Sequence, residues 1–144
     1  MTSAYVPLSL REMIITRAQG RCEYCQSPAR YSPEVFEVEH ILPLSSGGKT
    51  TLDNLALACP ACNRYKGRRQ GAIDPLTATE AALFNPRTQK WADHFRWSAD
   101  LQEIVGLTPT GRATVATLQT NRPAVTVFRL ALNIAGLHPA RGSG

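Results

Sequence analysis

Four cysteines, arranged as two short-spaced pairs, are the residues of this 144-residue chain whose types and spacing most directly indicate chemistry. The pairs are Cys22/Cys25 and Cys59/Cys62, and the sequence contains no other cysteine. A gap of two residues lets both thiolates of a pair turn onto one Zn²⁺ ion, at about 2.3 Å. The spacing therefore predicts one tetrahedral zinc site. Because thiolates would fill all four positions, we expect this zinc to be structural and not catalytic.

Two other uses of paired cysteines stay open at this point. A disulfide framework needs an oxidising compartment, and the sequence shows no secretory signal peptide before the cysteines, so we expect a reducing, cytoplasmic location. A redox Cys-x-x-Cys motif usually stands alone after a strand of a thioredoxin-like unit, whereas this chain has two such motifs. Both observations favour zinc.

Between the two cysteine pairs, the Glu39-His40 dipeptide offers a base beside an acid. Hydrolysis of a phosphodiester needs a base near pH 7 to activate water and a cation to neutralise the developing charge. A neutral imidazole suits the base, since its unperturbed pKa is about 6.5. A carboxylate with an amide oxygen, completed by waters, suits Mg²⁺ or Mn²⁺. The ordinary alternative for His40 is a hydrogen-bonded core or turn histidine.

Further motifs follow in a definite order between the first cysteine pair and residue 69. They are Glu39-His40-Ile41-Leu42-Pro43, Ser45-Ser46-Gly47-Gly48, Asp53-Asn54-Leu55 and Cys62-Asn63-Arg64-Tyr65-Lys66-Gly67. With these motifs, residues 20–69 resemble the zinc-bound form of the HNH endonuclease family. The resemblance covers about a third of the chain and implies a strand–strand–helix fold around a metal, called ββα-metal.

The resemblance also implies a role for each matched residue. His40 matches the general base, and Asn54 matches the residue that ties down the loop and orients this base. Glu39 and Asn63 match the ligands of a catalytic Mg²⁺ or Mn²⁺. Asn63 stands where the last His of the motif often stands and supplies a weaker, neutral oxygen, so we expect lower affinity for the ion. Glu39 stands where Asp is commoner, and its additional methylene is expected to shift the ion slightly. The implied activity is metal-dependent hydrolysis of DNA, leaving a 5′ phosphate and a 3′ hydroxyl.

A basic cluster follows the second cysteine pair and is consistent with a DNA partner. It consists of Arg64, Lys66, Arg68 and Arg69, in a chain of net charge +5 and pI near 9.3. Such a cluster beside a hydrolytic centre holds phosphates; Lys66 matches a lysine of the family, and the others rest on charge alone. Its ordinary alternative is a solvated helix end. A zinc-stabilised nucleic-acid-binding module without cleavage is the alternative function.

The elements that must position these residues are predicted from local patterns. In the first part of the chain we expect a helix over 10–19 opened by a capping box at Ser9 and Glu12, hairpin strands over 34–40 and 54–58, and a short helix over 60–69. After residue 70 we expect a helical turn over 79–84, strands over 90–99 and 101–107, and helices over 109–118 and 123–135.

The predicted fold class is therefore α+β. It has a ββα-metal core with a structural zinc knuckle site, an N-terminal helix and a C-terminal β-hairpin plus two helices. We expect a single domain over 1–144, with residues 20–69 as the core and residues 70–144 as an extension packed on it. The last helix of this extension has Val127, Leu130, Ala131 and Ile134 on one face. The longest apolar runs are shorter than the roughly 18 residues of a membrane span. The DNA target and the oligomeric state do not follow from the sequence.

Overall fold

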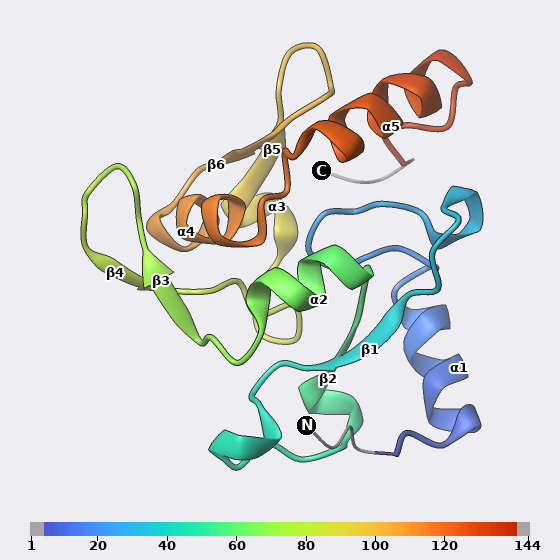
Figure 1. Ribbon diagram of the computed structural model, residues 1–144, viewed down its shortest axis with the longest axis vertical. Helices are drawn as coiled ribbons and strands as arrows, with labels where there is room; N and C mark the ends of the chain where they lie inside the picture. The colour runs from blue at the N-terminus through green and yellow to red at the C-terminus, as the bar shows by residue number, and fades with distance from the viewer. Residues whose placement is uncertain (1–4, 141–144) are drawn as a thin grey trace. The chain divides into compact units, whose positions relative to one another are not determined.

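The computed structural model describes residues 5–140, which divide into two compact units, one ending at Gln70 and one beginning at Gly71. Each unit contains both helices and short strands (Figure 1). All three sheets are pairs of antiparallel strands. The predicted α+β class is confirmed. Within residues 5–140, every helix is too short or too polar to cross a membrane.

The first unit is centred on a hairpin and the helix that follows it. Strand β1 (Glu37–His40) pairs with β2 (Leu55–Ala58), with Glu37 opposite Ala58 and His40 opposite Leu55. Strand β2 is buried along its whole length, as its uninterrupted apolar sequence indicates. Helix α2 (Pro60–Lys66) begins directly afterwards, with proline at its first position. The predicted strand–strand–helix order is present, in shorter elements than expected.

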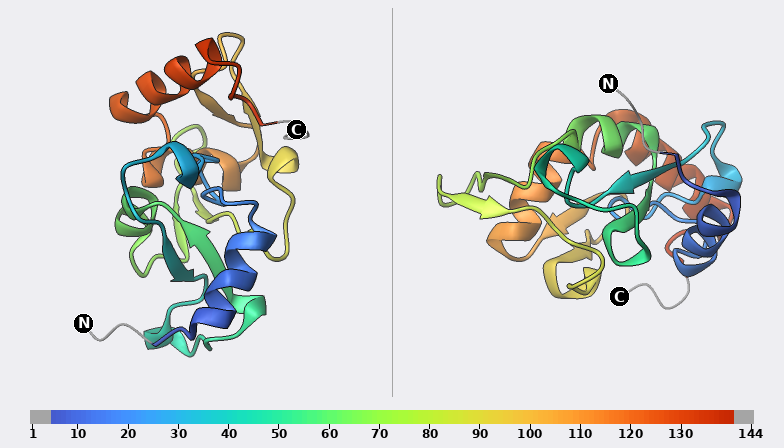
Figure 2. Two further views of the ribbon diagram at one scale, coloured as in Figure 1. Left: turned by 90° about the vertical axis from the view of Figure 1, so that its right-hand side faces the viewer. Right: turned by 90° about the horizontal axis from the view of Figure 1, so that it is seen from below.

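Helix α1 (Leu8–Arg17) lies alongside the hairpin and holds it through two arginines (Figure 2). The guanidinium of Arg11 donates to the Phe36 carbonyl at 2.7 Å. That of Arg17 donates to the carbonyls of Leu52 and Leu55 at 2.8 and 2.7 Å. The predicted capping box at Ser9 is wrong, because the helix already begins after Pro7 and Ser9 lies inside it.

The second unit contains two further hairpins and two longer helices. Its elements are β3 (Gly71–Ile73), β4 (Glu80–Ala82), α3 (Trp91–His94), β5 (Phe95–Trp97), β6 (Ile104–Gly106), α4 (Pro109–Leu118) and α5 (Pro123–Ile134). Helix α4 has the predicted cap, since the Thr108 hydroxyl accepts from the Gly111 amide at 3.0 Å. The helical turn predicted over 79–84 is instead β4, and the strand predicted over 90–99 begins as the short helix α3.

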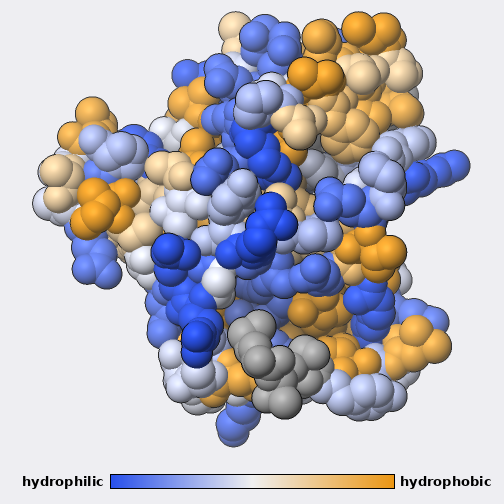
Figure 3. Space-filling model, viewed as in Figure 1, coloured by the Kyte–Doolittle hydropathy of each residue, from blue (hydrophilic) through white to orange (hydrophobic). Residues whose placement is uncertain are grey.

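The buried face of α5 differs from the predicted one. Val127, Leu130 and Ile134 are exposed, and Figure 3 shows apolar surface at its upper right, where α5 lies in Figure 1. The buried positions include Arg129, whose guanidinium donates to the carbonyls of Thr120 and Gln102 at 2.7 and 2.9 Å. A buried arginine that satisfies backbone carbonyls sets the orientation of this helix, and apolar spacing does not reveal it.

A buried carboxylate links the β3–β4 turn to α4. Asp74 is fully buried and accepts from Nε and Nη2 of Arg112, each at 2.9 Å. Its oxygens also accept from the Leu76 amide and the Thr77 hydroxyl. The hydrogen bonds from Arg112 hold the pKa of Asp74 well below its usual range.

We therefore expect Arg112→Met to lower the melting temperature of the second unit at pH 7 and to make that unit less sensitive to acid. A carboxylate whose folded pKa is depressed stabilises the fold above its unfolded pKa of about 3.9, and this stability is lost as pH falls further. The gap between the wild-type and variant melting temperatures should accordingly narrow below about pH 4. The fluorescence of Trp91 and Trp97, which lie in this unit, reports the melting.

The exposed Arg96 provides the control, since Arg96→Met removes a cation of the same kind that does not bind Asp74. A gap that stays constant from pH 7 to pH 3 would contradict the assigned role of the Asp74–Arg112 pair.

Candidate active site and metal centre

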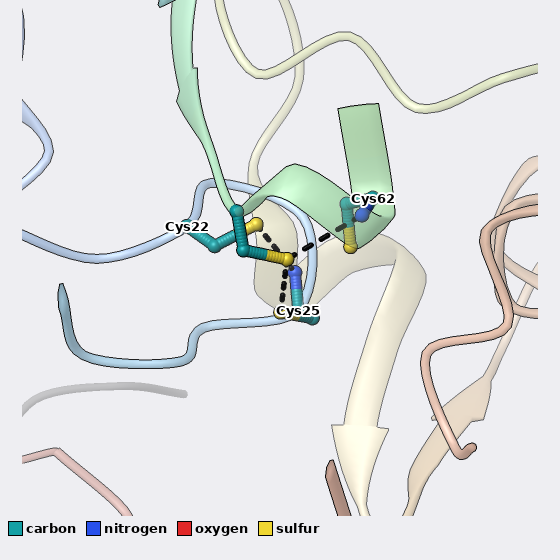
Figure 4. Close-up of side chains that lie close together, drawn as sticks. Cys22, Cys25 and Cys62 are labelled. Atoms are coloured by element: carbon teal, nitrogen blue, oxygen red, sulfur yellow. Dashed lines mark hydrogen bonds between the residues drawn. The ribbon is translucent and has the colours of Figure 1, made fainter. Parts of the chain in front are cut away.

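The four cysteines converge on one point in the first unit. Their sulfurs all lie within 4.8 Å of one another, and all four residues are buried free thiols (Figure 4). The amide of Cys25 donates to the sulfur of Cys22 at 3.5 Å, and that of Cys62 to the sulfur of Cys59 at 3.4 Å. Two matching knuckles thus present four sulfurs to one position. The predicted four-sulfur site is confirmed as a cluster of zinc-binding type.

The cluster joins two segments that are distant in sequence, the first knuckle and the stretch where β2 leads into α2. The first knuckle is tied to β2, because the Glu23 amide donates to the Leu57 carbonyl at 2.9 Å and the Glu23 carboxylate accepts from the Leu57 amide at 2.8 Å. Cys59 follows the last residue of β2 and is the N-cap of α2. Burial raises the pKa of the Cys22 thiol, so forming thiolates there is costly without a cation. A bound Zn²⁺ offsets this cost, which makes metal binding part of folding.

The carboxylate of Glu39 is buried between the first knuckle and α2. The residue is 4% exposed, and Lys66, itself 2% exposed, places its ammonium 2.7 Å from Oε1. The Tyr24 hydroxyl lies 3.0 Å from both carboxylate oxygens. Burial raises the pKa of Glu39, and Lys66 and Tyr24 oppose this shift by stabilising the charged form. Glu39 is therefore held in an internal ion pair.

The structure corrects the predicted role of Lys66. The ammonium, expected to contact DNA, instead binds Glu39 and donates to the Ile41 carbonyl at 3.1 Å. A buried cation committed to a buried carboxylate is not available to phosphate. The other members of the cluster, Arg64, Arg68 and Arg69, are exposed. Those three arginines keep the predicted character of a basic surface.

Asn63 is hydrogen-bonded to Glu37 and not to Glu39. Its amide nitrogen donates to the Glu37 carboxylate, which is exposed at the start of β1. Glu37 and Glu39 share the face of β1 that meets α2, since alternate residues of a strand point to the same side. Asn63 and Lys66 are one helical turn apart on α2, and each binds one of these two acids.

The predicted ligands do not fit a divalent ion as they lie. Both oxygens of Glu39 already accept hydrogen bonds in a site from which solvent is excluded, and the amide of Asn63 is turned to another carboxylate. An ion at Glu39 would have to displace the ammonium of Lys66. The donor set that suits Mg²⁺, oxygen ligands completed by several waters, is therefore not assembled around Glu39.

His40 lies at the end of β1 and contacts the loop that joins β1 to β2. Its Nε2 is 2.9 Å from the Thr50 hydroxyl, and its ring is partly buried. Burial lowers the pKa of His40 below the usual value, so the imidazole is neutral at pH 7. A neutral ring fixed at one nitrogen has the properties required of a general base.

Asn54 fastens the loop in the way that the resemblance implies. Its side-chain oxygen accepts from the Leu42 amide at 2.8 Å, and its nitrogen donates to the carbonyls of Leu42 and Lys49 at 3.1 and 2.9 Å. Gly48 packs against the same place, since a Cβ there would lie 1.8 Å from the Leu42 oxygen. The loop is thus closed by the Asn54 side chain and by Gly48, where any larger residue would clash with Leu42.

Tyr24 and Thr50 are parts of this site that the sequence pattern does not indicate. Tyr24 sits inside the first knuckle, at a position where the motif sets no requirement, and only the fold brings it to Glu39. Thr50 is ten residues from His40 in a loop without periodicity. The one available signal was the length of that loop, which the structure shows to be ordered by the short 3₁₀ turns Leu44–Ser46 and Leu52–Asn54.

We expect the purified chain to hold one zinc ion and Cys62→Ser to lose it. Removal of one of four thiolates leaves buried thiols without the cation that offsets their desolvation, so the variant should also lose helical circular dichroism. Native mass spectrometry gives the stoichiometry, and zinc released to a chromogenic chelator confirms it. Ser45→Ala, at an exposed position, is the control. One ion retained at full occupancy in Cys62→Ser would refute a four-thiolate site.

Comparison with known proteins identifies the segment that carries this site. Residues 22–69 match the family model described as HNH endonuclease. A stretch of 59 residues is 37% identical to the "Type IV methyl-directed restriction enzyme EcoKMcrA" of Escherichia coli strain K12. That stretch is 38% of this chain and 21% of the relative, so the chain matches about a fifth of the length of that protein.

Proposed function

We propose that this chain is an endonuclease that hydrolyses DNA phosphodiester bonds, with His40 as its general base, because residues 22–69 match the family model described as HNH endonuclease. The observation that carries the proposal is the position of the His40 ring at the end of β1, where Nε2 lies 2.9 Å from the Thr50 hydroxyl in the loop that Asn54 closes. Burial lowers the pKa of His40, which favours the neutral ring that a base requires. The relative supports a nuclease because its name describes a restriction enzyme.

In the proposed reaction, the oxygen of a water molecule attacks the phosphorus while the His40 imidazole takes its proton. The bond from phosphorus to the 3′ oxygen breaks, and this oxygen receives a proton from solvent. The products are a 5′ phosphate and a 3′ hydroxyl. Proton transfer to a positioned base of this kind contributes about 10²–10⁴-fold to the rate.

A catalytic Mg²⁺ or Mn²⁺ stays a prediction of the family resemblance. Such an ion would supply neutralisation of the charge that builds on the phosphoryl oxygens. Glu39 is paired with Lys66, and Asn63 is hydrogen-bonded to Glu37, so the reaction above involves no ion held by Glu39 and Asn63.

His40→Ala should reduce cleavage of supercoiled plasmid by about 10²–10⁴-fold while leaving DNA affinity unchanged, because the imidazole moves a proton and does not anchor the substrate. Relaxation of the plasmid is measured in Mg²⁺, in Mn²⁺ and in EDTA, on methylated and unmethylated DNA, since the relative is named as methyl-directed. Zinc content and melting temperature show that the variant is folded. Cleavage at the wild-type rate in His40→Ala would remove the base from the proposal.

The basic surface should make DNA binding sensitive to salt. Replacing Arg64, Arg68 and Arg69 by Gln should weaken binding to all sequences alike, and each lost phosphate contact should reduce the slope of log K against log salt by about 0.9. Fluorescence anisotropy across a salt series measures this slope. Arg30→Gln, which removes an exposed arginine outside the cluster, is the matched control. An unchanged slope in the triple variant would place DNA elsewhere.

A second function is favoured by one observation, the ammonium of Lys66 on the Glu39 carboxylate. If this pair excludes the catalytic ion, the chain is a zinc-stabilised nucleic-acid-binding module without cleavage activity. The plasmid experiment separates the two functions: DNA binding without cleavage under every ionic condition supports the binding module, and cleavage that depends on His40 supports the nuclease.

A further inference from the structure

The ring of His40 has one hydrogen-bond partner among residues 5–140. Nε2 lies 2.9 Å from the hydroxyl of Thr50, and Nδ1 is not hydrogen-bonded to any described residue. The ring is only partly buried, so Nδ1 is left for water or substrate. The chemistry of His40 therefore depends on which nitrogen carries the proton.

A neutral imidazole has one N–H, and the Thr50 hydroxyl is able to donate or to accept. If Nδ1 carries the proton, the hydroxyl donates to Nε2 and the ring keeps no free lone pair for water. If Nε2 carries the proton, it donates to the Thr50 oxygen and the lone pair of Nδ1 is free. Only this second tautomer acts as a base, and it needs no rearrangement once the ring is protonated, since both nitrogens are then donors.

We propose that Thr50 is the positioning residue of His40: its hydroxyl accepts from Nε2–H, fixes the ring, and assigns proton transfer to Nδ1. This inference rests on the proposed nuclease function and names the side chain through which the loop acts on the base. Thr50 itself contacts neither water nor substrate in this role.

The placement of Thr50 gives Asn54 a physical route to the base. The side-chain nitrogen of Asn54 donates to the carbonyl of Lys49, and the backbone amide of Asn54 donates to the carbonyl of Thr51, each at 2.9 Å. Thr50 lies between these two anchored residues. Asn54 therefore acts on His40 through the segment that holds Thr50.

The backbone of His40, at the other end of the hydrogen bond from Thr50, is also held by the hairpin. His40 is paired with Leu55 in the hairpin register, and the Ile41 amide donates to the Asn54 carbonyl at 2.9 Å. The strand that carries His40 and the loop that carries Thr50 are thus both fastened to Asn54. A hydrogen bond between two supported side chains holds a ring more precisely than one supported at a single end.

Two substitutions isolate the hydroxyl. Thr50→Val keeps the shape of the side chain and removes the hydroxyl, whereas Thr50→Ser keeps the hydroxyl. We expect Thr50→Val to lower kcat for DNA cleavage by about 10- to 100-fold, the range for a hydrogen bond to a group that becomes charged, with KM unchanged. Thr50→Ser should restore kcat. Thr16→Val, at an exposed position of α1, is the control for loss of a threonine hydroxyl.

Long-range ¹H–¹⁵N NMR of the zinc-loaded protein tests the same inference without cleavage. The chain has three histidines, so the His40 signal is the one absent from His40→Ala. In neutral His40 we expect the Nε2–H tautomer in the wild type and in Thr50→Ser, and a mixture of tautomers in Thr50→Val.

The two measurements distinguish failure of the inference from failure of the proposed function. A wild-type protein that cuts no DNA but shows the Nε2–H tautomer, lost in Thr50→Val, supports the role of Thr50 and refutes the nuclease. An Nδ1–H tautomer in the wild type overturns the inference. The inference is also overturned if Thr50→Val keeps both the kcat and the His40 tautomer of the wild type.

Discussion

The buried ion pair of Glu39 and Lys66 is the interaction on which the geometry of the first unit depends. Removing two charges from water costs several kcal/mol per ion, and attraction offsets this only when the remaining lone pairs and protons are satisfied. Here the Tyr24 hydroxyl and the Ile41 carbonyl supply the additional partners. The pair therefore fixes the first knuckle, β1 and α2 against one another. The four cysteines join the first knuckle to α2 as well, so the cysteine cluster and the ion pair hold the same elements together.

This junction separates the base from the acid that precedes it. Strand β1 is regular through His40, and neighbouring residues of a regular strand point to opposite sides. Glu39 is consequently turned to α2, while His40 is turned to the loop before β2. The support for the base comes from that loop, where Gly48 and Asn54 close the backbone around Leu42. The cysteine cluster and the ion pair hold β1 against α2, and the loop between β1 and β2 holds the His40 ring.

The parts of this structure that the sequence predicted are those set by local spacing. Two Cys-x-x-Cys pairs determine the sulfur cluster, Thr108 before Pro109 determines the start of α4, and apolar residues before Cys59 indicate β2. The hairpin of β3 and β4 was missed because three-residue strands leave no periodic pattern to detect. Lys66 and Thr50 were misjudged or missed because their roles are fixed by partners more than nine residues away.

The energy of the ion pair also bears on which acid of β1 is open to a cation. Breaking a buried pair by withdrawing one partner costs about 3–5 kcal/mol, because the other charge is left buried and uncompensated. An ion that displaced Lys66 would compensate the Glu39 carboxylate but would leave the buried Lys66 ammonium without its charged partner. Glu37 is exposed on the same face, and its partner there is the neutral amide of Asn63. A divalent ion on this face of β1 would therefore displace only a neutral amide at Glu37, whereas at Glu39 it would displace a buried ammonium. The family pattern nevertheless points to Glu39.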